Sequence, residues 1–157
     1  MIRLIALFAI MALPATAQTK IDLGGLTVDP SAEVEVSADS LSVDQDTGTA
    51  QFTGNVVVGQ GDLRMAAGAI RVVYDDATGD IGQLLASGGV TFVTATEAAE
   101  ADSADYNITN GTLTLSGNVL LTQGPSALSA DRMVINVADG TARMDGRVRT
   151  VFSQGNN

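Results

Sequence analysis

Phe52-Thr53-Gly54-Asn55-Val56 and Leu115-Ser116-Gly117-Asn118-Val119 share a Gly-Asn-Val motif, and its repetition decides the fold. Gly88-Gly89-Val90 and Gly146-Arg147-Val148 are weaker copies of the same motif. The four units that contain these copies open at Ala38, Ala67, Ala101 and Ala130. Self-similarity at a period of about 30 residues indicates a stacked or continuously wound β architecture.

Within the units, apolar side chains alternate with small polar ones, as in residues 112–116, which read Thr-Leu-Thr-Leu-Ser. This alternation is typical of strands that bury one face. Asn110-Gly111 and Asp139-Gly140 are strong hairpin turns because both positions need positive φ. We therefore predict an all-β chain with almost no helix. The extra residues around Asp80–Ser87 are placed in a loop, and Thr94–Asp105 could form one helical turn.

The amino terminus has the pattern of a cleavable signal peptide. An apolar run from Leu4 to Leu13 follows Arg3, and Ala15-Thr16-Ala17 supplies a cleavage site. The run is about half of the roughly 20 apolar residues that a spanning helix needs. We expect cleavage between Ala17 and Gln18.

The predicted organisation therefore has four parts. They are a cleaved signal peptide at 1–17, a flexible segment or edge strand at 18–32, a β domain at 33–152, and a polar tail at 153–157.

The composition argues against catalysis and against nucleic-acid binding. The chain has no His and no Cys, which removes the commonest general base, the thiol nucleophile and the soft metal ligands. The carboxylate pairs Asp75-Asp76 and Glu97 with Glu100 lie near turns, outside an apolar context that would raise one pKa. The net charge is −10, and −11 without Arg3, so nucleic-acid phosphates would be repelled. We expect no enzyme activity, no cofactor, no metal site and no nucleic-acid partner.

Two acidic patterns resemble parts of calcium sites, but each lacks ligands that such a site needs. Residues 44–48 read Asp-Gln-Asp-Thr-Gly, like the start of a calcium loop, but no Glu follows at the required spacing. Asp39, Asp102 and Asp131 recur near the unit openings, yet Gly68 interrupts the row. We interpret the first pattern as a turn and the second as marking the starts of strands.

The signal peptide, the Ala-Asp-Ser-Leu opening at 38–41 and the two Gly-Asn-Val segments together resemble the OstA/LptA family of lipopolysaccharide transport proteins. The resemblance runs from Glu33 to Phe152. It implies a twisted, V-shaped β-jelly-roll in the Gram-negative periplasm, whose hydrophobic groove holds the acyl chains of lipid A. It also implies head-to-tail pairing with copies of itself and with related β-jelly-roll domains at the inner and outer membranes.

On this resemblance, the phase of the repeat assigns the residues of the groove. They are Val43, Phe52, Val58, Val72, Phe92, Ile108, Leu115, Leu121, Ile135 and Met144. Val, Leu, Ile and Met around an incompletely filled slot suit acyl chains. At the junction between copies, Arg147 and Arg149 of one chain are expected near Glu33 and Glu35 of the next.

Two alternatives stay open on the sequence. One is a structural β-solenoid or filament protein with a filled core, which lipid co-purification would distinguish from a lipid carrier. The other is the membrane-tethered partner domain of the same transport system, which would need an uncleaved anchor of spanning length.

Overall fold

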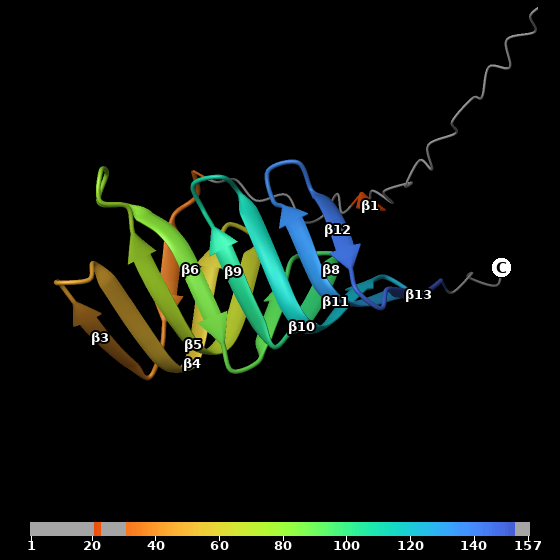
Figure 1. Ribbon diagram of the computed structural model, residues 1–157, viewed down its shortest axis with the longest axis horizontal. Coiled ribbons are helices and arrows are strands. Elements are labelled where there is room, and N and C mark those ends of the chain that lie inside the picture. Colours follow the sequence, from red (N-terminus) through yellow and green to blue (C-terminus); the bar gives the residue numbers. More distant parts are fainter. Residues whose placement is uncertain (1–20, 23–30, 153–157) are drawn as a thin grey trace, which may run out of the picture.

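The computed structural model describes residues 21–22 and 31–152, and every regular element in these ranges is a β-strand of one 13-stranded antiparallel sheet (Figure 1). The strands are β1 Ile21–Asp22, β2 Val34–Ser37, β3 Ser40–Asp44, β4 Thr49–Gln60, β5 Leu63–Tyr74, β6 Ile81–Ser87, β7 Val90–Val93, β8 Glu97–Ala101, β9 Ser103–Asn107, β10 Thr112–Gln123, β11 Ser126–Asn136, β12 Thr141–Asp145 and β13 Arg149–Val151. The predicted all-β class is confirmed. The proposed cleavage site at Ala17 and Gln18 and the polar tail lie outside the described residues.

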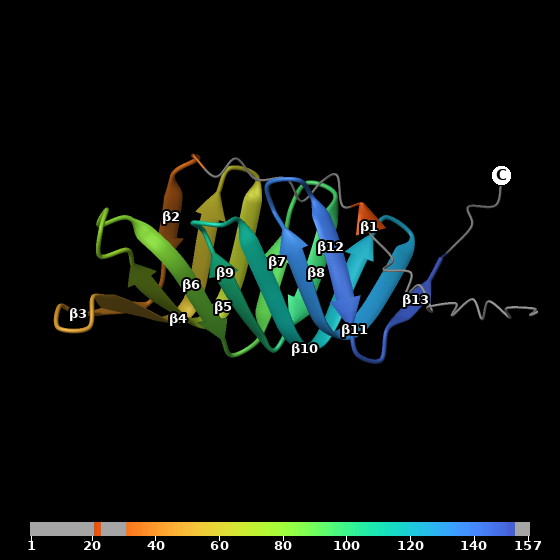
Figure 2. The same cartoon turned by 45° about the horizontal axis from the view of Figure 1, so that its top comes forward.

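Four long strands, β4, β5, β10 and β11, fold the sheet into two facing layers. Each pairs with two short strands, one along each half of its length: β4 with β2 and β3, β5 with β7 and β6, β10 with β8 and β9, and β11 with β13 and β12. We call the layer of β2, β7, β8 and β13 the β2 layer, and the layer of β1, β3, β6, β9 and β12 the β9 layer. Figure 2 shows the two layers meeting along their lower side.

The repeated Gly-Asn motif forms the line along which the sheet folds, here called the crease. The registers of β4 with β5 and of β10 with β11 shift at residues 53–56 and 116–119. In the first copy Gly54 has a φ of 81° and Asn55 a φ of 45°. Gly adopts such angles freely and Asn tolerates the left-handed region, so this pair can form the bulge that bends the long strand.

An aspartate between the two short strands that pair with each bulged strand closes the bulge. The Asp102 N–H donates to the Gly117 carbonyl at 2.9 Å, and the Asn118 side-chain amide donates to the Asp102 carboxylate at 2.9 Å. Asp39 makes the same two contacts with Gly54-Asn55, at 2.9 and 2.8 Å. In these two units, the Ala-Asp opening and the Gly-Asn-Val segment therefore contact each other.

The other two copies vary this contact. Arg147 takes the place of Asn and donates to Asp131 at 2.6 Å. Gly68 takes the place of the aspartate and approaches Gly88 so closely that a Cβ on Gly68 would lie 3.2 Å from the Gly88 carbonyl oxygen. The aspartate and the amide are thus lost together in the unit that opens at Ala67.

Two local predictions are wrong. Asp80–Ser87, expected in a loop, contains β6, since Leu84 and Ala86 are buried and the strand pairs with β5 and β9. Thr94–Asp105, where one helical turn was expected to be possible, contains β8 and the first residues of β9. Pairing of β8 with β7 and β10 overrides the helix propensity of its Glu and Ala residues.

Candidate lipid-binding groove

Apolar side chains from both layers fill the space between them. The predicted groove residues that are buried there are Val58, Val72, Phe92, Leu115, Leu121 and Ile135. Those that are partly buried and packed against this core are Phe52, Ile108 and Met144. Val43 alone among the predicted set is exposed, at 60%. In this structure the predicted groove is therefore a closed interior over most of its length.

The inner apolar face continues beyond the closed interior at the β3 end. Val43 pairs with the buried Ala50, and Leu41 pairs with the partly buried Phe52, so both β3 side chains lie on the inner face. Leu41 is 56% exposed. The β9 layer thus presents inward-facing apolar side chains that no described residue of the β2 layer covers.

The β13 end also has exposed apolar side chains on its inner face. Thr150 pairs with the buried Leu128 and therefore faces inward. Val148 and Phe152, two residues to either side, share this phase and are 51% and 75% exposed. Both ends of the molecule therefore expose an apolar inner surface.

A cleft of about 660 Å³ opens between the two layers near β2. Its apolar lining comes from Ala32 and Val34 on one side and from Ile81 and Ile108 on the other. Its polar residues are Ser31, Gln60, Asp75, Thr78, Asp80 and Thr109. The cleft combines an apolar lining with a polar rim, as ligand sites commonly do.

A buried hydrogen bond lies beside this cleft. The Tyr106 hydroxyl donates to Gln60 Oε1 at 2.9 Å, and Gln60 Nε2 donates to the Ala32 carbonyl at 3.2 Å. Gln60 is 1% exposed and Tyr106 2%. Burial raises the pKa of Tyr106, which keeps the phenol protonated and able to donate. No pattern in the sequence predicted this pair.

Glu97 is a second buried polar group. Its burial corrects the prediction that this residue lies near a turn and outside an apolar context. Glu97 is 4% exposed, and its carboxylate accepts hydrogen bonds from Thr94, Thr96 and Gln123. Glu100 points to the opposite, exposed side of β8. The two carboxylates therefore do not converge, and a paired acid–base role has no geometric support.

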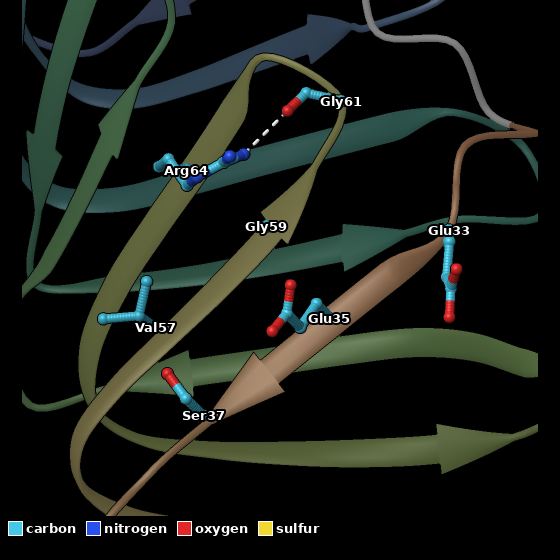
Figure 3. Close-up of a pocket in the computed structure, with 7 residues that line it drawn as sticks. All are labelled: Glu33, Glu35, Ser37, Val57, Gly59, Gly61 and Arg64. Atoms are coloured by element: carbon cyan, nitrogen blue, oxygen red, sulfur yellow. Dashed lines mark hydrogen bonds between the residues drawn. The ribbon is translucent and has the colours of Figure 1, made fainter.

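The outer face of the β2 end carries the two predicted interface glutamates (Figure 3). Glu33 and Glu35 are exposed beside a shallow pocket of about 260 Å³ that Arg64 also lines. Arg64 donates to the backbone carbonyls of Gly61 and Leu63, at 2.7 and 2.8 Å. Its guanidinium charge is directed at carbonyl dipoles, so the negative charge of this edge comes from the two glutamates.

At the β13 end, the two predicted interface arginines differ. Arg147 pairs with Asp131 of its own chain at 2.6 Å, and hydrogen bonding to Arg147 lowers the pKa of the Asp131 carboxyl. Arg149 is exposed on β13 and pairs through its backbone with Ser129. Its side chain lies on the outer face, as those of Glu33 and Glu35 do.

Two antiparallel layers that enclose an apolar interior define a sheet-on-sheet fold. No helix among residues 21–22 and 31–152 is long and apolar enough to cross a membrane. The family model described as "LptA/(LptD N-terminal domain) LPS transport protein" matches residues 35–141. The chain belongs to this family, which is described as one of lipopolysaccharide transport proteins, and its fold and family are those of a transport protein and not of an enzyme. The resemblance predicted from the Gly-Asn-Val segments is confirmed.

Two known proteins extend the comparison. LptH of Pseudomonas aeruginosa, described as the LptA-homologous periplasmic component of the lipopolysaccharide transport device, superposes with a TM-score of 0.73 at 17% identity. The match covers 81% of this chain and 99% of LptH, which confirms the LptA-like β-jelly-roll fold. An uncharacterized protein of Rhizobium meliloti (strain 1021) is 29% identical over 113 residues. That alignment covers 67% of this chain and 61% of the relative's length.

Proposed function

We propose that this chain is a periplasmic bridge protein that carries lipopolysaccharide from the inner to the outer membrane, with the acyl chains on its apolar inner surface. The observation that carries the proposal is the exposed apolar inner face at both ends of the molecule. At one end it comprises Leu41 and Val43, and at the other Val148 and Phe152. Exposed apolar surface that continues a core is typical of an interaction site.

The positions of these ends support a head-to-tail assembly. β2 and β3 stand at one end of the folded sheet, and β12 and β13 at the other. Stacking the β13 end of one copy on the β2 end of the next would join the two inner faces and bury the exposed apolar side chains. Backbone pairing between edge strands would supply the hydrogen bonds. Related β-jelly-roll domains at the two membranes would use the same edges.

The charges of the two ends are complementary in this arrangement. Glu33 and Glu35 lie on the outer face at one end, and Arg149 lies on the outer face at the other. Arg147 is already paired with Asp131, so we assign it a weaker part in the junction than Arg149. Charges at a rim of this kind tune association more than they drive it.

Localisation in the periplasm is part of the same proposal. The description of LptH as a periplasmic component supports it. The proposed signal cleavage between Ala17 and Gln18 would release the chain there, whereas the tethered-partner alternative requires Met1 to be retained. Terminal sequencing of the protein from its native source decides between them: a chain that begins at Gln18 supports the proposal, and an intact amino terminus in the membrane pellet contradicts it.

Native mass spectrometry of the purified protein tests lipid carriage. Bound lipopolysaccharide is expected with the wild type and is expected to be reduced in Ile108→Asp, which places a carboxylate in the apolar lining of the cleft. Val57→Asp is the matched control, because Val57 is 40% exposed and lies outside this cleft, on the outer face of β4. A wild type that binds no lipid would instead favour the purely structural alternative.

A further inference from the structure

The Gln60–Tyr106 hydrogen bond joins the two layers of the sheet. Gln60 ends β4 at the edge of the β2 layer, and Tyr106 belongs to β9 in the opposite layer. Through its second hydrogen bond, Gln60 also fixes Ala32, the residue two positions before β2. The Gln60 side chain thus connects three segments at the β2 end of the molecule.

The bond lies at the boundary between the cleft and the buried interior. Gln60 lines the cleft, together with Val34 and Ile108. Both Gln60 and Tyr106 belong to the fully or almost fully buried set, which also contains Met65 and Ile70. A hydrocarbon chain that entered the interior from the cleft at this point would displace this pair.

Among the described residues 31–152, the equivalent glutamine of the second half bonds within one layer and not across the two. Gln60-Gly61 ends β4 as Gln123-Gly124 ends β10. Gln123 donates to Glu97, which lies on β8 in the same layer. Two equivalent glutamines therefore make different contacts, and the one at the β2 end is the one that ties the layers together.

The hydrogen bond between the buried Gln60 amide and the buried Tyr106 phenol can both hold the two layers together and allow them to separate. Breaking the bond without replacement leaves two buried polar atoms unsatisfied, which holds the empty molecule closed. When the layers part, water or the polar part of a lipid can satisfy both groups, so the open state is accessible. A purely apolar contact would offer no such exchange of partners.

We propose that the Gln60–Tyr106 hydrogen bond is a latch that closes the β2 end of the empty molecule, and that an acyl chain enters the interior by displacing it. The proposal rests on lipid carriage as the function of the interior. It predicts that the closed state limits binding, so that weakening the latch raises both the rate and the affinity of lipid uptake.

Tyr106→Phe tests the latch by removing one hydroxyl and no ring atoms. Tyr74→Phe is the matched control, since Tyr74 is the other tyrosine of the chain, is 39% exposed and is not among the residues lining the cleft. Fluorescently labelled lipopolysaccharide is mixed with each variant in a stopped-flow instrument. The association rate and the affinity of Tyr106→Phe are expected to rise roughly three- to tenfold, the equilibrium effect of losing one hydrogen bond, with no change in Tyr74→Phe.

Hydrogen exchange without lipid supplies an independent measurement of opening. In Tyr106→Phe, amides of the β4–β5 turn and of β9 are expected to exchange faster by a similar factor, with Tyr74→Phe unchanged. If exchange accelerates but the wild type and the variant bind no lipid, the latch stands and lipid carriage is wrong. If Tyr106→Phe matches the wild type in exchange, or binds lipid more weakly, the latch is wrong while the carriage proposal is judged on the wild type alone.

Discussion

Gly117 lies at the crease, where the fold leaves no room for even a Cβ atom. Its φ is 79°, and a Cβ there would lie within clashing distance of the Asp102 carboxylate. Gly89 provides a matched comparison, because its φ is 81° but a Cβ on it would have no atom within 4 Å. The two positions therefore separate backbone strain from collision with the aspartate.

We expect Gly89→Ala to lower the free energy of unfolding by about 1–2 kcal/mol, the cost of placing an L-residue at positive φ. Gly117→Ala should lose at least about 1 kcal/mol more, because Asp102 must move and its bond to Asn118 is lost. Urea titrations followed by circular dichroism measure both. Equal losses in the two variants would show that the crease accommodates a side chain freely.

Tyr106 provides a prediction for alkaline pH. Burial raises its pKa above the ordinary value of 10.0, so the folded state holds the phenolic proton more tightly than the unfolded state. The resulting stability is fully present below about pH 10 and is lost as the pH rises through the folded-state pKa. We expect the free energy of unfolding of the wild type to fall more steeply above pH 10 than that of Tyr106→Phe. Parallel slopes in urea titrations from neutral to alkaline pH would contradict this expectation.

Leu115 marks a limit on testing the groove by substitution. Its side chain is 0% exposed, as is that of the neighbouring core residue Leu121. An unpaired aspartate at Leu115 costs several kcal/mol and should unfold the chain, so its loss of lipid binding would carry no information on the groove. We expect Leu115→Asp to lack the cooperative thermal transition that Ile108→Asp retains, because Ile108 is only partly buried. Circular dichroism melting curves compare the two.

At the scale of elements, local pattern was sufficient for most strands and for the crease. Alternation at residues 112–116 predicted the first half of β10, and the repeated Gly-Asn motif marked the bends of β4 and β10. β6 and β8 were missed for different reasons. β6 was read as an insertion because it interrupts the repeat, and β8 is made of Glu and Ala, whose helix preference is outweighed by pairing on both sides.

The candidate site was less predictable than the fold. The phase of the repeat indicated which side chains face inward, but not that the two layers close on one another. Tyr106 and Gln60 are 46 residues apart, and their contact depends on how the layers face, which no local pattern reports. The Gln-Gly pair that ends both β4 and β10 was the available signal, since a Gln repeated at equivalent turns has a fixed position.

In the proposed head-to-tail assembly, β13 is the strand that would pair with the next copy. It pairs with β11 along one side, and a neighbouring copy would add to its other side. Proline at Arg149 removes a backbone donor and disfavours strand pairing, whereas Arg149→Ala removes only the charge. We expect Arg149→Pro to be monomeric, and Arg149→Ala to form oligomers shorter than those of the wild type. Light scattering across protein concentration measures this, and an Arg149→Pro variant that assembles like the wild type would refute edge pairing through β13.

The whole molecule carries its charge asymmetrically. The net charge is −10, yet Arg132, Arg143, Arg147 and Arg149 lie in the last quarter of the chain. Asp145 and Asp131 pair with two of them, Arg143 and Arg147. A head-to-tail oligomer brings this basic end against the acidic β2 end of the next copy, which partly offsets the repulsion between strongly acidic chains.

Salt and charge exchange test this arrangement at the level of the assembly. Raising the ionic strength from about 50 to about 500 mM screens the junction and should shorten the oligomers. Glu35→Arg places an arginine on both sides of the junction, and Arg149→Glu places a carboxylate on both sides, so each variant alone should assemble poorly. Mixed in equal amounts, the two variants restore opposite charges at every junction and should form alternating oligomers as long as those of the wild type. Light scattering that detects no gain on mixing would show that these charges do not meet between copies.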